Sequence, residues 1–111
     1  MKDLPKKAQE IDYLIAEDTE KNRVMGVIGL GGGRVRTFFV HPDYQGKGIG
    51  RKLYSHIEEK AKTQGLQELI VVSSKYAEPI YEMFGFKKIE VLHKEKNGGY
   101  YQEVLMKKVF I

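Results

Sequence analysis

The chain opens with a pattern of apolar and polar positions that is typical of strands. Apolar, aromatic and β-branched residues gather at 11–17, 24–30 and 34–40, and polar or glycine-rich turns separate these stretches. Connections this short join antiparallel neighbours. Gly26 and Gly29, inside the second stretch, indicate a bulge or a close backbone neighbour. The pattern therefore predicts an antiparallel meander of three strands.

After residue 48 the spacing of apolar positions changes from that of a strand to that of a helix. An amphipathic helix is expected over 49–64, with charged residues on its outer side. Gly65 follows where a left-handed cap would end this helix. The residues that recur four positions apart, on one face, are Ile49, Leu53, Ile57 and Ala61.

The rest of the chain returns to strands around one more helix. The run 69–72 is wholly apolar, as a strand buried on both faces would be. A short helix is expected over 77–84, and the segments 86–94 and 100–110 form a hairpin. The element order is therefore β-β-β-α-β-α-β-β. It predicts a mixed α/β fold whose sheet is mostly antiparallel, with one parallel, right-handed βαβ unit built around the long helix.

Length and composition narrow the class of protein. The chain has 111 residues, which fits one domain over residues 1–111. It has no cysteine, which excludes a disulfide scaffold and a thiol nucleophile, and a cytoplasmic location is expected. No apolar run is long enough to cross a bilayer, so we expect no membrane contact. No constellation of three ligands suggests a metal.

The charge is mildly basic and spread along the chain. Its net value is +4, from 19 basic and 15 acidic side chains. A nucleic-acid-binding domain more often gathers its basic residues on one helix or stripe, so we expect no nucleic-acid partner. The clearest local concentration is Lys47, Arg51 and Lys52, at the start of the long helix.

Residues 45–50, which we call the glycine loop, lie between the third strand and the long helix. Their sequence is Gln-Gly-Lys-Gly-Ile-Gly. The N-terminus of a helix leaves N–H groups without partners, and its dipole adds partial positive charge. Glycines let those groups converge and let a phosphate approach closely, so the loop predicts an anion site. Its G-x-G-x-G spacing matches neither the dinucleotide fingerprint nor the P-loop.

The glycine loop fits the Q/R-x-x-G-x-G/A motif of the GNAT acetyltransferases, and residues 77–86 resemble the A-x-x-x-Y-x-x-x-G-F segment of that family. The order of elements is similar too, so residues 11–111 are identified as a member of the family. The chain departs from the pattern at its start, where the family has a strand and two helices that wall the acceptor site. That departure indicates a minimal member, a truncated chain, or a dimer that supplies the wall.

The resemblance implies acetyl-CoA as a co-substrate and no metal. The third strand and the run 69–72 would part at their C-terminal ends, and the pantetheine arm would lie between them along Phe39 and Val40. An N–H group near Val40 would polarise the thioester carbonyl, and the basic residues at the loop would meet the 3′-phosphate. The residues that would hold the pyrophosphate and the charges beside it are Gln45, Gly46, Lys47, Gly48, Ile49, Gly50 and Arg51.

Tyr81 matches the tyrosine with which the family protonates the departing CoA thiolate. A thiolate leaving group needs a nearby donor, and a phenol can share a proton with it. A core role is the other interpretation, because Ile80, Tyr81 and Phe84 form an apolar face. The general base is not identified. Glu17 and Asp18 could act through water, or they could be turn residues that face solvent.

The leading hypothesis is an N-acetyltransferase that moves an acetyl group from acetyl-CoA to a primary amine by direct transfer in a ternary complex. The acceptor would be a small molecule or a peptide, and a homodimer through the last strands is expected. A non-catalytic acyl-CoA-binding module is the alternative, because neither the acceptor wall nor the base is identified. His41, at a strand end, is expected to be partly exposed and without a nearby carboxylate.

Overall fold

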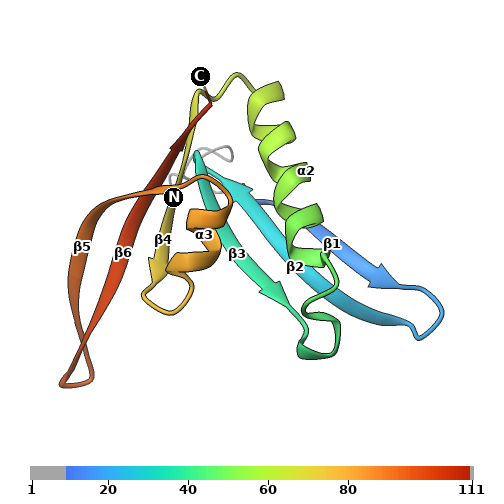
Figure 1. The fold of residues 1–111 in the computed structure, drawn as a ribbon, viewed down its shortest axis with the longest axis horizontal. Coiled ribbons are helices and arrows are strands. Elements are labelled where there is room, and N and C mark those ends of the chain that lie inside the picture. Colours follow the sequence, from blue (N-terminus) through green and yellow to red (C-terminus); the bar gives the residue numbers. More distant parts are fainter. Residues whose placement is uncertain (1–9, 111) are drawn as a thin grey trace, which may run out of the picture.

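The computed structural model describes residues 10–110, in which six strands and two α-helices follow one another with a short 3-10 helix before the longer α-helix (Figure 1). The observed ends differ from the expected ones by one or two residues at most. In this part of the chain no helix combines the length and apolar character needed to cross a membrane. The bounds are β1 (Asp12–Asp18), β2 (Arg23–Gly31), β3 (Arg34–Val40), η1 (Pro42–Tyr44), α2 (Ile49–Thr63), β4 (Glu68–Ser74), α3 (Glu78–Met83), β5 (Lys87–Lys96) and β6 (Gly99–Val109).

The six strands form one sheet in the order β1-β2-β3-β4-β6-β5. Neighbouring strands are antiparallel except β3 and β4, which are parallel and joined through α2. Short turns can connect only antiparallel neighbours, whereas a parallel pair needs a crossover long enough to hold a helix. The predicted mixed sheet with one parallel βαβ unit is confirmed.

Both α-helices pack on the same face of the sheet (Figure 1). On β4, Leu69 and Val71 are buried beneath them, while Ile70 and Val72 stay partly exposed on the other face. The prediction that this strand is buried on both faces is therefore wrong, because the helices cover only one. The buried residues of α2 are Leu53, Tyr54, Ile57 and Ala61.

Gly26 and Gly29, inside β2, have the roles that the sequence predicts. The register between β2 and β3 shifts between Ile28 and Leu30, so Gly29 lies at a bulge. A Cβ atom on Gly26 would come within 2.8 Å of the Phe39 carbonyl oxygen and 3.0 Å of a Leu53 methyl carbon. The absence of a side chain at Gly26 thus lets β2, the end of β3 and α2 approach one another closely.

The parallel strands β3 and β4 pair at one end only. Their register holds the single pair Arg34↔Ile70, and the Ile70 N–H donates to the Gly33 carbonyl at 3.1 Å. From there the strands diverge toward Val40 and Ser74, and the sheet opens into two halves (Figure 1). The parting of these strands, which the family resemblance implied, is confirmed. Beyond the pair, β3 has no strand partner on this side within residues 10–110.

Candidate active site

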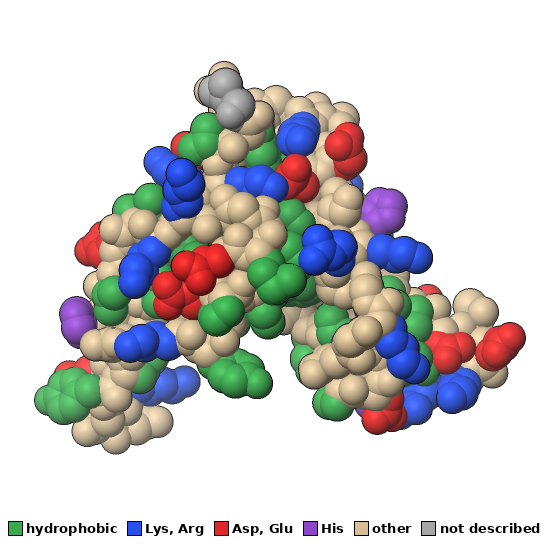
Figure 2. Space-filling view, in the orientation of Figure 1, with side chains coloured by type: hydrophobic (Ala, Val, Ile, Leu, Met, Phe, Trp, Pro, Cys, Tyr) green, Lys and Arg blue, Asp and Glu red, His purple; other side chains and the backbone are tan. Residues whose placement is uncertain are grey.

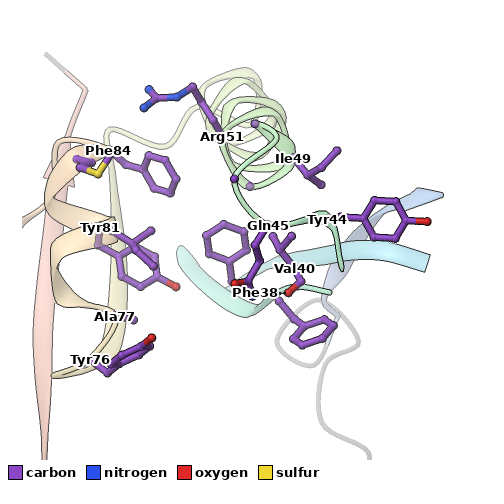
Figure 3. Close-up of a pocket in the computed structure, with 16 residues that line it drawn as sticks. Phe38, Val40, Tyr44, Gln45, Ile49, Arg51, Tyr76, Ala77, Tyr81 and Phe84 are labelled. Atoms are coloured by element: carbon purple, nitrogen blue, oxygen red, sulfur yellow. Dashed lines mark hydrogen bonds between the residues drawn. The ribbon is translucent and has the colours of Figure 1, made fainter. Parts of the chain in front are cut away.

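A cleft of about 710 Å³ opens between the two halves of the sheet. Figure 2 shows it as a notch that divides one side of the molecule, with hydrophobic side chains along its walls. One wall is formed by the end of β3 and the glycine loop, and the other by α3 and the residues before it (Figure 3). The predicted site residues that line the cleft are Phe39, Val40, Gln45, Gly46, Gly48, Ile49, Gly50, Arg51 and Tyr81.

The glycine loop gives α2 an N-terminus with unpaired backbone donors. Gly46 and Gly48 have φ angles of 78° and 82°, a left-handed conformation that glycine adopts without strain. No side chain caps the helix at Gly48, and the first helical hydrogen bond runs from the Lys52 N–H to the Gly48 carbonyl at 3.1 Å. The N–H groups from Gly48 to Arg51 therefore precede the helical ladder, as an anion site requires.

The side chain of Gln45 fastens the glycine loop to β3. Its Nε2 donates to the Val40 carbonyl at 3.0 Å. The Gln45 N–H, which the sequence analysis placed against an anion, already donates to the Pro42 carbonyl at 3.4 Å. Gln45 thus braces the loop through its side chain, and the N–H groups that remain for a ligand begin further along the loop.

The basic side chains near the loop point in different directions. Arg51 lines the cleft, and its guanidinium lies at the α2 end of the opening (Figure 3). The Lys47 ammonium lies 5.7 Å from the centroid of the Tyr44 ring, over which a cation is attracted by the π-electrons. Neither Lys47 nor Lys52 is part of the cleft lining. Of the three basic residues expected at a phosphate, the structure brings Arg51 alone to the cleft.

Tyr44 is a cleft residue that the sequence analysis did not identify. Its hydroxyl points away from α3 and donates to the Asp18 carboxylate at 2.7 Å (Figure 3). This hydrogen bond lowers the pKa of Asp18 and raises the pKa of Tyr44. Asp18 is therefore a weak base, and neither Glu17 nor Asp18 lines the cleft. The bond ties η1, which directly precedes the glycine loop, to the end of β1, a contact for which the local sequence gives no signal.

His41 belongs to the turn that leads into the glycine loop. Its Nδ1 accepts a hydrogen bond from the Asp43 N–H at 3.1 Å and lies 3.9 Å from the Asp43 carboxylate. The expectation that no carboxylate lies near His41 is wrong, because the 3-10 turn folds Asp43 back beside the ring. His41 does not line the cleft. Its contacts show a structural role in shaping the turn.

Tyr81 stands on the opposite wall, on α3. Its side chain is 6% exposed and packs among Phe38, Phe84 and Phe86, with ring centroids 5.6–6.4 Å apart. The hydroxyl end projects toward the β3 side of the cleft (Figure 3). Burial raises the pKa of Tyr81 to about 12, so the phenol keeps its proton at neutral pH. The ring belongs to the core and the hydroxyl to the cleft, so the core and donor interpretations are compatible.

The cleft therefore joins two chemical features. Unpaired N–H groups and Arg51 suit an anion at one end, and the Tyr81 phenol can donate a hydrogen bond at the other. Within residues 10–110, no cluster of three or more Asp, Glu, His or Cys side chains could hold a metal ion.

Comparison with known proteins assigns this arrangement to a family. The model of the acetyltransferase (GNAT) domain matches residues 3–109. The chain is also 33% identical over 55 residues to glucosamine 6-phosphate N-acetyltransferase of Trypanosoma brucei brucei. That match covers 50% of this chain and 37% of the trypanosome protein, so the two are alike over little more than a third of the relative.

Solved structures share the fold. A GCN5-related N-acetyltransferase from Rhodopseudomonas palustris is 26% identical with a TM-score of 0.78, over 87% of this chain and 60% of that one. A GNAT family acetyltransferase from Elizabethkingia anophelis, solved with acetyl-CoA bound, is 16% identical with a TM-score of 0.74, over 94% and 79% of the two chains. The predicted fold class is confirmed by these neighbours.

Proposed function

This chain belongs to the GNAT acetyltransferase family, and we propose that it transfers an acetyl group from acetyl-CoA to a primary amine by direct transfer in a ternary complex. The observation that carries the proposal is the cleft, which has the unpaired N–H groups of Gly48–Arg51 at one end and the Tyr81 phenol at the other. An extended coenzyme suits this arrangement, because its anionic end can meet the N–H groups while its reactive thioester end meets the phenol. The structural neighbour from Elizabethkingia anophelis contains acetyl-CoA.

In this proposal the coenzyme bridges the two halves of the sheet. Its pyrophosphate accepts hydrogen bonds from the glycine loop, with Arg51 supplying a full positive charge beside it. Its pantetheine arm lies along Phe39 and Val40, where β3 has parted from β4 and can pair with an extended ligand as it would with a strand. The parting of the sheet is thus what admits the coenzyme.

The chemical step follows from the groups at the far end of the cleft. The neutral amine nitrogen attacks the thioester carbonyl carbon, and a C–N bond forms as negative charge develops on oxygen. The C–S bond then breaks, and Tyr81 shares its proton with the departing sulfur. The nitrogen gives up a proton to water, and solvent restores the phenol. The products are the N-acetylated amine and CoA with a free thiol.

For the acceptor, the similarity to a glucosamine 6-phosphate N-acetyltransferase supports an amino-sugar phosphate as the first compound to test. Peptide amines and other small-molecule amines are the compounds to test next. The second candidate function is a non-catalytic acyl-CoA-binding module. It is favoured by the fact that, within residues 10–110, no carboxylate or imidazole lines the cleft as a base.

The test compares wild type with Tyr81→Phe in an assay that detects the CoA thiol. With glucosamine 6-phosphate, an aminoglycoside and peptide α-amines as acceptors, we expect wild type to turn over at least one. Loss of the Tyr81 hydroxyl should lower kcat by about a hundredfold, which is the usual contribution of a positioned acid. The dissociation constant of CoA should not change, because the loop that binds the pyrophosphate is intact.

Tyr100→Phe is the control, since Tyr100 is 82% exposed on β6 and lies outside the cleft. It should have the wild-type kcat. Binding of acetyl-CoA without transfer to any acceptor would favour the binding module instead. Absence of CoA binding at millimolar concentration would overturn both candidates.

A further inference from the structure

Lys108, near the end of β6, connects three elements through one ammonium group. Its Nζ donates to the Glu58 carboxylate on α2 at 2.6 Å and to the Phe84 carbonyl, at the end of α3, at 2.7 Å. The same Nζ lies 5.5 Å from the centroid of the Tyr54 ring. Glu58 and Phe84 are 50 and 24 residues away from Lys108 along the chain. The contact therefore joins α2, α3 and β6.

The chain makes room for this lysine. Gly85 has a φ of +100°, and a Cβ atom on it would lie 3.1 Å from Cε and 3.3 Å from Nζ of Lys108. A side chain at Gly85 would be strained at this φ and would also crowd Lys108, which would have to shift by a few tenths of an ångström. Gly85 is part of the segment that the sequence analysis linked to the family, and this contact gives a physical reason for a glycine there.

The charges are partly withdrawn from water and matched to each other. The Lys108 and Glu58 side chains are 24% and 19% exposed. Tyr54 also donates its hydroxyl to Glu58 at 2.7 Å, and Lys62 lies 3.1 Å from the other carboxylate oxygen. Burial opposes ionisation of Glu58, but the bonds from Lys108, Tyr54 and Lys62 outweigh it and lower the pKa to about 2. Glu58 is therefore charged at neutral pH.

The contact lies close to the proposed proton donor. Phe84 stacks on Tyr54 with ring centroids 4.5 Å apart and an angle of 3° between the planes. The Tyr81 carbonyl, one turn earlier, accepts hydrogen bonds from the N–H groups of Phe84 and Phe86, each at 3.0 Å. Because α3 spans only six residues, a tie at its last turn also restrains Tyr81. The other end of the tie, Glu58, is on the helix whose first turn faces the proposed pyrophosphate site.

We propose that Lys108, held by Glu58, is a positioning residue. It fixes α3 against α2, the helix that holds the coenzyme, so that the Tyr81 hydroxyl lies at the reacting thioester. This inference rests on the proposed function, because it assigns a kinetic role to a contact outside the cleft. Lys108 is not among the residues that line the cleft. Its loss should therefore lower kcat and leave the affinity for the coenzyme unchanged.

The test is Lys108→Met, which keeps a long side chain and removes the charge and both hydrogen bonds. Lys62→Met is the matched control, because Lys62 also pairs with Glu58 but does not reach α3. We expect kcat of Lys108→Met to fall by about tenfold or more, because small displacements of catalytic groups lower the rate by such factors. KM for acetyl-CoA should stay within about twofold, and Lys62→Met should keep the wild-type kcat.

A double-mutant cycle separates positioning from general loss of stability. If Lys108 acts through Tyr81, then Lys108→Met should change kcat by less than about twofold in a Tyr81→Phe background. A lysine that only stabilises the fold would lower activity by the same factor in both backgrounds, and that result would overturn the inference. If Lys108→Met does not fold, Glu58→Gln removes the attraction between the charges and should show the same pattern to a smaller degree.

Hydrogen exchange gives a readout that needs no turnover. In Lys108→Met, the N–H groups of Phe84 and Phe86 should exchange faster than in wild type, while those at the start of α2 keep their rates. Wild type that transfers no acetyl group would overturn the proposed function. In that case unchanged exchange at Phe84 and Phe86 would overturn the restraint as well, whereas faster exchange would support it. Active wild type with an unchanged kcat in Lys108→Met would overturn the inference alone.

Discussion

Tyr81 and Glu58 have pKa values shifted in opposite directions, and the cause differs. Burial without a charged partner raises the pKa of Tyr81 to about 12. Burial also disfavours the charged form of Glu58, but Lys108, Tyr54 and Lys62 hydrogen-bond to the carboxylate and bring its pKa down to about 2. One residue therefore keeps its proton and the other keeps its charge throughout the neutral range. In the proposed reaction, the protonated Tyr81 is the donor to the leaving thiolate, and the charged Glu58 holds Lys108.

The lowered pKa of Glu58 predicts a specific loss of stability in acid. The pKa of Glu58 in the folded protein, about 2, is below the ordinary value of 4.5, so the stabilisation is present above pH 4.5 and is lost as the pH falls toward 2. The shift corresponds to at most about 3 kcal/mol. Glu58→Gln should be less stable than wild type at pH 7, and the difference between the two should shrink between pH 4.5 and 2. Urea unfolding across that range measures it.

Glu59→Gln is the matched control, since Glu59 is the exposed neighbour of Glu58 on the same helix. Its unfolding free energy should follow that of wild type with pH. A constant difference between Glu58→Gln and wild type from pH 7 to pH 2 would contradict the assignment.

Among the elements, β2 and β3 hold the glycine loop in place through close backbone contact. Gly26 lets the Phe39 carbonyl approach β2, and Gln45 fastens the loop to the Val40 carbonyl at the same strand end. The start of α2 is thereby fixed against the sheet. The anion site depends on this packing as much as on the glycines of the loop itself.

Gly26→Ala should therefore affect both stability and coenzyme binding. The added methyl group would lie 2.8 Å from a backbone oxygen that cannot move without shifting β3. We expect a loss of about 1–3 kcal/mol in unfolding free energy, typical of overpacking, and weaker binding of CoA. Urea unfolding and calorimetric titration measure the two effects.

Gly99→Ala serves as the control, because Gly99 also lies in a strand and its added methyl group would meet the nearest atom at an ordinary 3.5 Å. It should cost less stability than Gly26→Ala and leave CoA binding unchanged. Equal effects of the two substitutions would show that the close approach at Gly26 is not the cause.

For the whole molecule, the divided sheet is the feature that links fold to proposed function. The two halves pair through one register position between β3 and β4, and otherwise meet through the packing of α2 and α3. A ligand that contacts both walls of the cleft would hold the halves together. Association of two chains through the last strands stays a prediction.

CoA should accordingly stabilise the whole chain against unfolding. A ligand that binds only the folded state adds about 2.7 kcal/mol at a concentration 100 times its Kd. We expect the thermal midpoint to rise with CoA concentration. Adenosine 3′,5′-bisphosphate, which lacks the pyrophosphate and the pantetheine arm, should raise it less at equal concentration. An equal rise with both ligands would contradict the proposed bridge across the cleft.

The sequence alone determined the elements, their order, the mixed sheet and the glycine loop. These features depend on local signals: the spacing of apolar residues, glycines at turns, and a helix that begins directly after a strand. Through its resemblance to the GNAT family, the sequence also pointed to Tyr81 and to most of the residues that line the cleft. Such signals act within one element or between neighbours in the chain, so they can be recognised without coordinates.

Only the tertiary structure decided which face of β4 is covered, where the basic side chains point, and what holds Tyr81. The Lys47 ammonium lies over the Tyr44 ring and Lys47 is not part of the cleft lining. Asp18 is bound by a hydroxyl 26 residues away. The Lys108 contacts join residues 24 and 50 positions apart. Partners that distant are brought together by the packing of helices on one face of a divided sheet, and no local pattern specifies that arrangement.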